Sequence, residues 1–451
     1  MNLVLELTKL LFWFLSLWWN LSLYIPKTIY NTIRYRMIGP SYGLLPNTVF
    51  LGGFGASPED FPNTVYWGSV GDKIMWQPKT GTFSSNEDKA TELVSSLLGL
   101  KHVTYFDNSG HDSSKKTCCN SSWLYNLSLF LMKAYNMGDM KDFGRPKSVS
   151  STDKINFIVH SAGAGTIMQT IVYLHLHKIG LIKDKVHKGQ KLTADEAKLI
   201  DLVKDVANDK YRILFKDDDD VPIDIGPDCI NKIVFISPTA GGVDYVRSST
   251  GMDGDDLSFS VFGFGWTSAW FVILLDRLMS FVPFRLFNLY LSQFSTLSAF
   301  PSGTDTGLQG FVEPVARQLT NDSMCICMLY NIKTLRVYTT SSVKIGGVYL
   351  PSPCTSPVLL LAIPFGCGWR NDAKYGEKYS QELLEHDGTI SVFSQRYGHS
   401  CECNKLVTLT PNVKQCIVCK SLFTDCDHLS ILGRNSTTAV AHERLLDWLN
   451  K

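Results

Sequence analysis

The chain has 451 residues, of which 45% are hydrophobic, so it is long enough to form one large domain or two smaller ones around a sizeable core. Its 43 basic and 42 acidic residues give a formal net charge of +1, and we therefore expect no nucleic-acid partner. Twelve cysteines spread over this length exclude a small disulfide-stapled scaffold.

The first predicted element is an apolar segment at the N-terminus. Residues 10–25 are apolar apart from Ser16, Asn20 and Ser22, and basic residues flank the segment. The segment is short for a span, since a bilayer core needs roughly 20 residues. A cleaved signal peptide, a short signal anchor and an interfacial helix all fit. The tryptophans and the lack of a small-x-small cleavage site favour a retained, membrane-associated segment over residues 1–37.

The globular part, residues 38–451, begins with a Gly/Pro-rich linker over residues 38–46. A short buried strand is predicted at Thr48–Leu51, and it leads into the turn Gly52-Gly53-Phe54-Gly55. Apolar residues at helical spacing predict a helix at Asp88–Leu100, and another is predicted at Ser121–Tyr135.

A serine follows the next apolar run. Residues 156–160 read Asn-Phe-Ile-Val-His, and Ser161-Ala162-Gly163-Ala164-Gly165 opens a helix that we expect to run to about Leu176. A strand, a sharp turn of small residues and a helix are typical of a nucleophilic serine on an elbow. Val159 stands where the G-x-S-x-G pattern has its first glycine, so a strand–helix turn with an incidental serine also fits.

The later elements continue the alternation of strands and helices. Residues 183–225 are highly charged and predict a solvated insertion, and Lys232–Ser237 predicts a strand. The range 243–300 contains 19 uncharged residues, 257–275, which fit either a membrane span or an apolar cap over a binding cleft. Further strands are predicted at Thr334–Thr340 and Pro357–Ile363. This order predicts an α/β fold with a mostly parallel sheet flanked by helices.

A serine nucleophile needs a histidine to accept its proton and usually a carboxylate to orient that histidine. In α/β-hydrolases these residues follow the serine in the order acid, then histidine. Asp387 lies on a turn after a helical stretch, and His428 lies in a loop before the last helix. Each alone has a plain structural interpretation, as a turn aspartate or a buried histidine. Together with Ser161 they form a candidate triad.

Five short segments in order resemble the thermoalkalophilic bacterial triacylglycerol lipases, known as lipase family I.5. The resemblance covers nearly everything from Thr48 onward and implies an α/β-hydrolase fold with a helical cap. It rests on segments that match the family's SSNWDRA, nucleophile elbow, DTARYDLS, RNAA–WLENDGIV and DHLEIIG motifs, here residues 83–90, 157–164, 305–308, 370–390 and 427–433.

The resemblance implies roles for individual residues. Ser161 would be the nucleophile, His428 the general base and acid, and Asp387 its orienting carboxylate. The backbone N–H groups of Ala162 and Phe54 would form the oxyanion hole. The family has His-Gly where this chain has Gly52-Gly53, so one supporting side chain is missing from that turn.

The family also carries a zinc ion held by two aspartates and two histidines. Asp88, His111 and Asp276 match three ligands, whereas Lys115-Lys116-Thr117-Cys118-Cys119 stands where the second histidine is expected. A structural zinc with an unknown fourth ligand is therefore an expectation, and no cofactor is required for the chemistry. The family's calcium is not carried over, because Ser430 replaces its acidic ligand.

A cysteine-rich insertion is expected at about residues 397–426. Cys401, Cys403, Cys416 and Cys419 have a spacing that suits either a zinc knuckle or disulfides. Five N-x-S/T sequons support a glycoprotein of the secretory pathway, membrane-associated or secreted, and so favour disulfides.

The functional expectation is a lipase or esterase that hydrolyses lipid carboxylic esters, with triacylglycerol as the expected substrate, through a Ser-His-Asp acyl-enzyme. A lipid–water interface is the expected place of action, and the N-terminal segment is the expected contact with a membrane surface. Two alternatives stay open: an inactive lipid-binding protein on a hydrolase scaffold, and an acyltransferase that uses the same three residues.

Overall fold

The computed structural model describes about half of the chain. The predicted helix at Ser121–Tyr135, the predicted cap at 243–300 and the predicted strand at Pro357–Ile363 lie outside the described residues. The described residues are 2–38, 47–53, 76, 78, 80, 86–100, 146–202, 212–217, 219–242, 313–346, 348–353, 355, 385, 387–397, 420–424, 426–428, 431 and 439–450.

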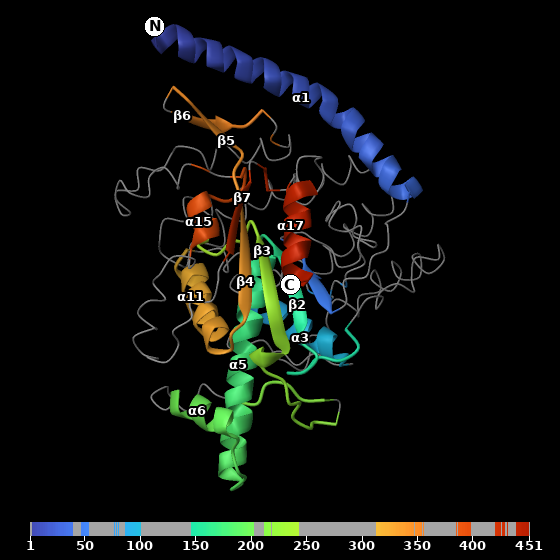
Figure 1. Ribbon diagram of the computed structural model, residues 1–451, viewed down its shortest axis with the longest axis vertical. Helices are drawn as coiled ribbons and strands as arrows, with labels where there is room; N and C mark the ends of the chain where they lie inside the picture. Colours follow the sequence, from blue (N-terminus) through green and yellow to red (C-terminus); the bar gives the residue numbers. More distant parts are fainter. Residues whose placement is uncertain are drawn as a thin grey trace, which may run out of the picture.

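A five-stranded parallel sheet forms the centre of the described part (Figure 1). Its strands stand in the same order across the sheet as along the chain: β1 (Thr48–Leu51), β2 (Ile155–His160), β3 (Ile230–Ile236), β4 (Lys333–Thr339) and β7 (Lys420–Thr424). Parallel neighbours need crossover connections, and long helices lie in the first three: α3 (Asn86–Leu98), α5 (Gly163–His187) and α11 (Glu313–Leu329). The predicted class, a parallel sheet flanked by helices, is confirmed.

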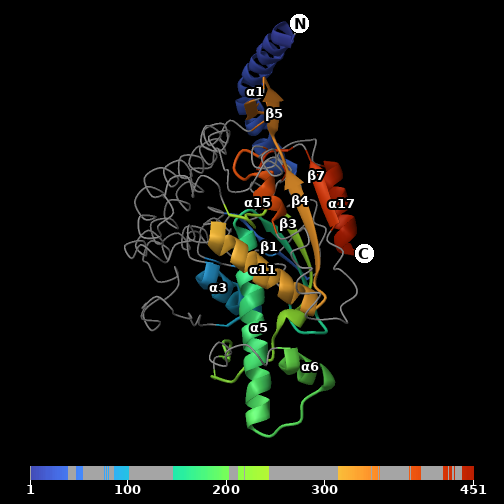
Figure 2. The same cartoon turned by 90° about the vertical axis from the view of Figure 1, so that its left-hand side faces the viewer.

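Helices α3, α5 and α11 cover one face of this sheet (Figure 2). Because side chains alternate between the two faces of a strand, Ile155, Phe157 and Val159 of β2 all point to this side. They pack in one cluster with residues such as Leu93 of α3 and Ile171 of α5, each with no exposed surface. Full burial of each such side chain contributes about 1.5–3 kcal/mol to stability.

Helix α17 (Ala439–Asn450) covers the opposite face (Figure 2). Its Leu445 and Leu449 pack against Ile158 and other strand residues that point to this side. The Nζ of Lys232, on β3, donates to the carbonyl oxygens of Trp448 and Leu449 at 3.1 and 2.9 Å. A cation thus caps the end of the helix, where carbonyl groups lack intrahelical partners.

Helix α5 is longer than predicted: it continues past Leu176 to His187 and takes the first residues of the charged insertion. The insertion is fastened to the helix by His177, whose ring is fully buried. Its Nε2 donates to the carbonyl oxygen of Ile223 at 2.7 Å, and its Nδ1 accepts from Leu214 N at 2.9 Å. The insertion therefore contributes to the core, and only part of it is solvated. It also contains helix α6 (Ala194–Leu202).

The predicted cysteine-rich insertion also contains sheet structure. Strand β7 lies within residues 397–426 and pairs with β4, with Val337 opposite Leu422. Five residues of that range thus belong to the central sheet. The strand that they form, β7, ends shortly before His428.

Helix α1 (Asn2–Ile38) extends well beyond the predicted apolar segment on both sides. It lies beside a two-stranded antiparallel hairpin, β5 (Ser342–Ile345) and β6 (Val348–Pro351), which follows β4 directly (Figure 1). Among the described helices, none combines the length and apolarity needed to cross a membrane.

Other elements are short. The 3-10 helix η4 (Pro227–Cys229) leads into β3, and α15 (Val392–Arg396) follows the Asp387 turn. Ser391 caps α15, because its hydroxyl accepts from Ser394 N at 3.2 Å.

Candidate active site

Ser161 lies on the turn between β2 and α5, at the carboxyl end of the sheet. Its backbone φ is +55°, a left-handed conformation that is uncommon for a residue with a side chain. The turn is held because Ser161 N donates to the carbonyl oxygen of Ile236 on the neighbouring strand at 3.0 Å. Such strain costs on the order of 1–3 kcal/mol and persists only where the surroundings over-determine it.

The small residues of the turn are explained by close contacts. A Cβ on Gly163 would lie 2.7 Å from the carbonyl oxygen of Gly52 and 2.8 Å from that of Leu51. Glycine at position 163 therefore lets the first turn of α5 approach the end of β1. A Cβ on Gly165 would lie 2.6 Å from the side chain of Asn86, so glycine at this position lets the start of α3 pack closely against α5.

Val159, which departs from the G-x-S-x-G pattern, does not crowd the turn. It lies in β2, opposite Leu51 of β1 and Phe235 of β3, before the chain turns at Ser161. Its side chain is fully buried in the core cluster on the helix-covered face. The valine is accommodated as an ordinary core residue of the strand.

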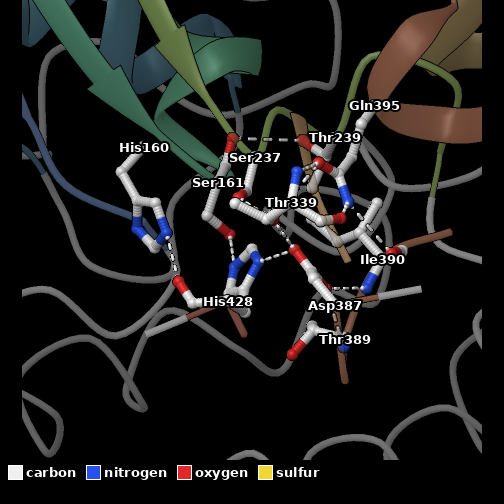
Figure 3. Close-up of polar contacts among 10 residues, drawn as sticks. All are labelled: His160, Ser161, Ser237, Thr239, Thr339, Asp387, Thr389, Ile390, Gln395 and His428. Atoms are coloured by element: carbon white, nitrogen blue, oxygen red, sulfur yellow. Dashed lines mark hydrogen bonds and ion pairs between the residues drawn. The ribbon is translucent and has the colours of Figure 1, made fainter. Parts of the chain in front are cut away.

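The structure brings Ser161, His428 and Asp387 together (Figure 3). The Oγ of Ser161 lies 2.8 Å from Nε2 of His428, and Nδ1 of His428 lies 2.7 Å from Oδ2 of Asp387. A carboxylate accepts, so Nδ1 carries the ring proton and Nε2 is left to accept from the serine hydroxyl. The imidazole is thus in the tautomer that can remove a proton from Ser161.

The backbone of His428 is also held at both ends of the residue. Its N–H donates to the carbonyl oxygen of Asp387 at 2.9 Å. Its carbonyl oxygen accepts from Nε2 of His160 at 2.8 Å, and the two imidazole rings lie with centroids 4.6 Å apart. His160, the last residue of β2, therefore fixes the histidine loop beside the serine that follows it in the chain (Figure 3).

Four donors surround the Asp387 carboxylate, which has no exposed surface. Oδ1 accepts from the N–H groups of Thr389 and Ile390 at 2.9 and 2.8 Å. Oδ2 accepts from the hydroxyl of Thr339 at 2.9 Å and from His428 at 2.7 Å. Burial raises the pKa of Asp387, but the attraction of His428 and the hydrogen bonds from His428, Ile390 and Thr389 outweigh burial, so the pKa lies below its ordinary value. Asp387 is therefore an anion near neutral pH.

A second group of residues supports this carboxylate from the ends of β3 and β4. The Thr339 hydroxyl has one proton, which goes to Asp387, so the hydroxyl of Ser237 must donate to Thr339 Oγ1 at 2.5 Å. The side-chain amide of Gln395 accepts from Thr339 N at 2.8 Å and donates to Thr339 O at 2.9 Å. These contacts align the end of β4 with the Asp387 turn (Figure 3).

Sequence reasoning missed His160, Ser237, Thr339 and Gln395. Three of the four stand within one residue of the carboxyl end of a parallel strand, which is where α/β folds place their sites. That position was a usable signal for these three, because their strands were predicted. Gln395 lies on α15 and carries no comparable signal.

One of the two expected oxyanion donors is described. Ala162 precedes α5, and its N–H has no acceptor among the described residues. The positive end of the dipole of this 25-residue helix points to the same place. Phe54 lies outside the described residues.

Of the three expected zinc ligands, only Asp88 lies within the described residues. Asp88 lies half-buried in the first turn of α3, whereas His111 and Asp276 lie outside the described residues. No group of three or more His, Cys, Asp or Glu side chains that could hold a metal occurs among the described residues. Cys401, Cys403, Cys416 and Cys419 also lie outside them.

Neither a protein-family model nor a curated protein sequence matches the chain. Several solved structures align with most of the chain. EstA from Clostridium botulinum is 15% identical, with 92% of this chain and 89% of that chain covered and a TM-score of 0.48. Staphylococcus hyicus lipase is 12% identical (90% and 95% covered, TM-score 0.45), and lipase 1 from Pelosinus fermentans is 13% identical (89% and 99% covered, TM-score 0.45). With its parallel sheet, its helices on both faces and its serine on the β2–α5 turn, the chain has the α/β-hydrolase fold.

Proposed function

We propose that the chain is a serine hydrolase that cleaves carboxylic esters of lipids, with triacylglycerol as the expected substrate. The proposal rests above all on one observation: an unbroken line of hydrogen bonds from Ser161 Oγ through His428 to Asp387, with distances of 2.8 and 2.7 Å. The lipid substrate is the part of the proposal that comes from the resemblance to the bacterial lipases.

In the proposed reaction Ser161 Oγ attacks the ester carbonyl carbon while its proton passes to Nε2 of His428. The negative oxygen that forms would be bound by the Ala162 N–H. Such a donor lowers the activation free energy by about 3–4 kcal/mol. The intermediate collapses to an acyl-enzyme, and His428 returns the proton to the departing alcohol. Water then gives a proton to Nε2 of His428 and attacks the acyl carbon. The bond between that carbon and Ser161 Oγ breaks, Oγ takes the proton back from His428, and the fatty acid leaves.

Asp387 serves this cycle without exchanging protons. As a buried anion it holds the imidazole in the required tautomer and stabilises the imidazolium that forms in both halves of the cycle. Its low pKa matters here, because a neutral Asp387 would lose its attraction for the positive ring.

Labelling with a fluorophosphonate probe tests the proposal, because the probe reacts only with an activated serine. We expect the wild-type chain and a Ser148→Ala control, at an exposed serine, to label equally, and Ser161→Ala not to label. Absence of label on the wild-type chain, or equal label on Ser161→Ala, would falsify the proposed nucleophile.

Hydrolysis of a series of triacylglycerols and short esters then defines the substrate. Free fatty acid as the main product supports a hydrolase, whereas transfer of the acyl group to an added alcohol in preference to water would make the chain an acyltransferase. A parallel measurement with a chelator reports whether a metal supports the activity.

A further inference from the structure

Helix α1 is attached to the rest of the molecule by polar contacts on one of its sides. The indole Nε1 of Trp13 donates to the carbonyl oxygen of Pro351 at 2.6 Å. The carboxylate of Glu6 accepts from the N–H of Gly346 at 2.7 Å. Both contacts go to the β5–β6 hairpin, so the face of α1 that carries Glu6 and Trp13 is turned toward the protein.

Another face of the same helix carries an apolar stripe. The stripe consists of side chains at intervals of three and four residues, all of them exposed: Val4, Leu7, Leu11, Phe14, Leu15 and Trp18. At 3.6 residues per turn these positions share one face of a helix, about 130° around the axis from Glu6 and Trp13. Exposed apolar side chains also lie off the stripe: Leu3, Leu5, Leu10, Phe12, Trp19 and Leu23. An ordinary surface helix instead turns its apolar side chains to the core.

The composition of α1 indicates what could cover the stripe. Soluble monomers rarely expose a contiguous apolar patch of this kind. The stripe ends on a tryptophan that is 63% exposed. Alongside the stripe, Lys9 pairs with Glu6 at 2.7 Å, and the sequence of α1 continues after the stripe with three basic residues and no acidic one: Lys27, Arg34 and Arg36. An apolar stripe with an aromatic side chain, followed along the helix by basic residues, complements the acyl boundary and the headgroups of an anionic lipid surface.

The placement of α1 connects this surface with the candidate active site. Strand β4 ends at Thr339, whose hydroxyl binds Asp387, and the hairpin that holds α1 begins three residues later at Ser342. In Figures 1 and 2, α1 and the hairpin lie beyond the end of the sheet at which β4 ends, and α6 lies at the opposite end of the molecule. The stripe and the catalytic serine are therefore at the same end.

We propose that the apolar stripe of α1 docks on an anionic lipid surface, and that the β5–β6 hairpin thereby holds the carboxyl end of the sheet, with Ser161, next to that surface. Docking itself does not depend on ester hydrolysis. The consequence for substrate, that the ester comes from the lipid phase, rests on the proposed function.

Co-sedimentation of the full chain with phosphatidylcholine–phosphatidylserine vesicles tests the docking. Two charges in the stripe, Leu11→Glu with Leu15→Glu, should lower the vesicle partition coefficient at least about tenfold. Val186→Glu with Val315→Glu is the matched control, since both valines are exposed on α5 and α11, and it should bind as wild type does. The neutral pair Leu11→Ser with Leu15→Ser repeats the test without added charge, and thermal melting checks that each variant is folded.

Two activity measurements separate the parts of the proposal. The Leu11→Glu, Leu15→Glu variant should retain hydrolysis of a soluble short-chain ester and lose hydrolysis of an ester embedded in vesicles. Ser161→Ala should bind vesicles as wild type does, so failure of catalysis leaves the docking result intact. Wild-type-like binding by both stripe variants would overturn the docking, as would a dimer that the stripe substitutions dissociate in the absence of lipid.

Discussion

Removing the Thr339 hydroxyl should weaken the site without touching the three central residues. Thr339→Val keeps the shape of the side chain and deletes the donor that lies 2.9 Å from Asp387 Oδ2. A hydrogen bond to a charged group contributes about 1.5–3 kcal/mol. The buried Ser237 hydroxyl also loses its acceptor, which costs roughly 1 kcal/mol more. We therefore expect a loss of about 2–4 kcal/mol in the free energy of unfolding at neutral pH.

The effect should depend on pH in a defined direction. The folded-state pKa of Asp387 is lowered, so its contribution to stability is present above the unfolded pKa and is lost as pH falls through the folded pKa. Because the Thr339 hydroxyl donates to the carboxylate, Thr339→Val should raise that folded pKa, and the difference between the variant and wild type should shrink in acid. For kcat/KM we expect a loss of about 5- to 30-fold, because one of four donors to the orienting carboxylate is gone.

Urea unfolding at neutral and acidic pH measures both effects. Thr340→Val is the matched control, since within the described part of the chain the hydroxyl of Thr340 bonds only to that of Ser342, at 3.3 Å. Adding Ser237→Ala to Thr339→Val should recover the part of the loss due to the stranded hydroxyl. Equal destabilisation by Thr339→Val and Thr340→Val, or a difference that does not change with pH, would refute the assigned role of Thr339.

Three further substitutions test the elbow and the triad. Asp387→Asn should lower kcat by about 10⁴-fold, through the wrong imidazole tautomer, with little change in KM; a loss below tenfold in steady-state kinetics would contradict the orienting role. Gly163→Ala should destabilise the fold by more than 1 kcal/mol in urea unfolding, since its Cβ would lie 2.7 Å from a carbonyl oxygen; unchanged stability would show that the turn relaxes. Val159→Gly, which restores the G-x-S-x-G pattern, should cost about 2–4 kcal/mol because a fully buried side chain is removed; a more stable and more active variant would contradict the core role of Val159.

The central residues of the site could be predicted because each stands in a distinctive local sequence. Ser161 follows a β-branched run and precedes small residues, and Asp387 and His428 follow in the order that the fold requires. The residues that support the triad could not be identified from their local sequence. Thr339 looks like any threonine at the end of a strand, and its role arises from register with the Asp387 turn, which only the folded chain shows.

The fold was predictable as a class but not in its boundaries. The helix after Ser161 was expected to end near Leu176, before Gly180 and a run of charges. In the structure Gly180 is no helix end: its Cβ would lie 2.6 Å from the backbone of Arg212, so the glycine marks where the returning chain crosses the helix. Strand β7 was hidden because nearby cysteines pointed to an insertion, and five residues carry too short a pattern to identify a strand.

The order of the sheet has a consequence for biosynthesis. The five described strands lie across the sheet in the order in which they are translated, and β7 is the last of them. The hydrogen bond that activates Ser161 joins it to His428, 267 positions later in the sequence, on the segment that follows β7. A nascent chain can therefore build the serine turn early while the hydroxyl is still unactivated. Such long-range closure is slow, and it delays hydrolytic competence until the segment after β7 has been made.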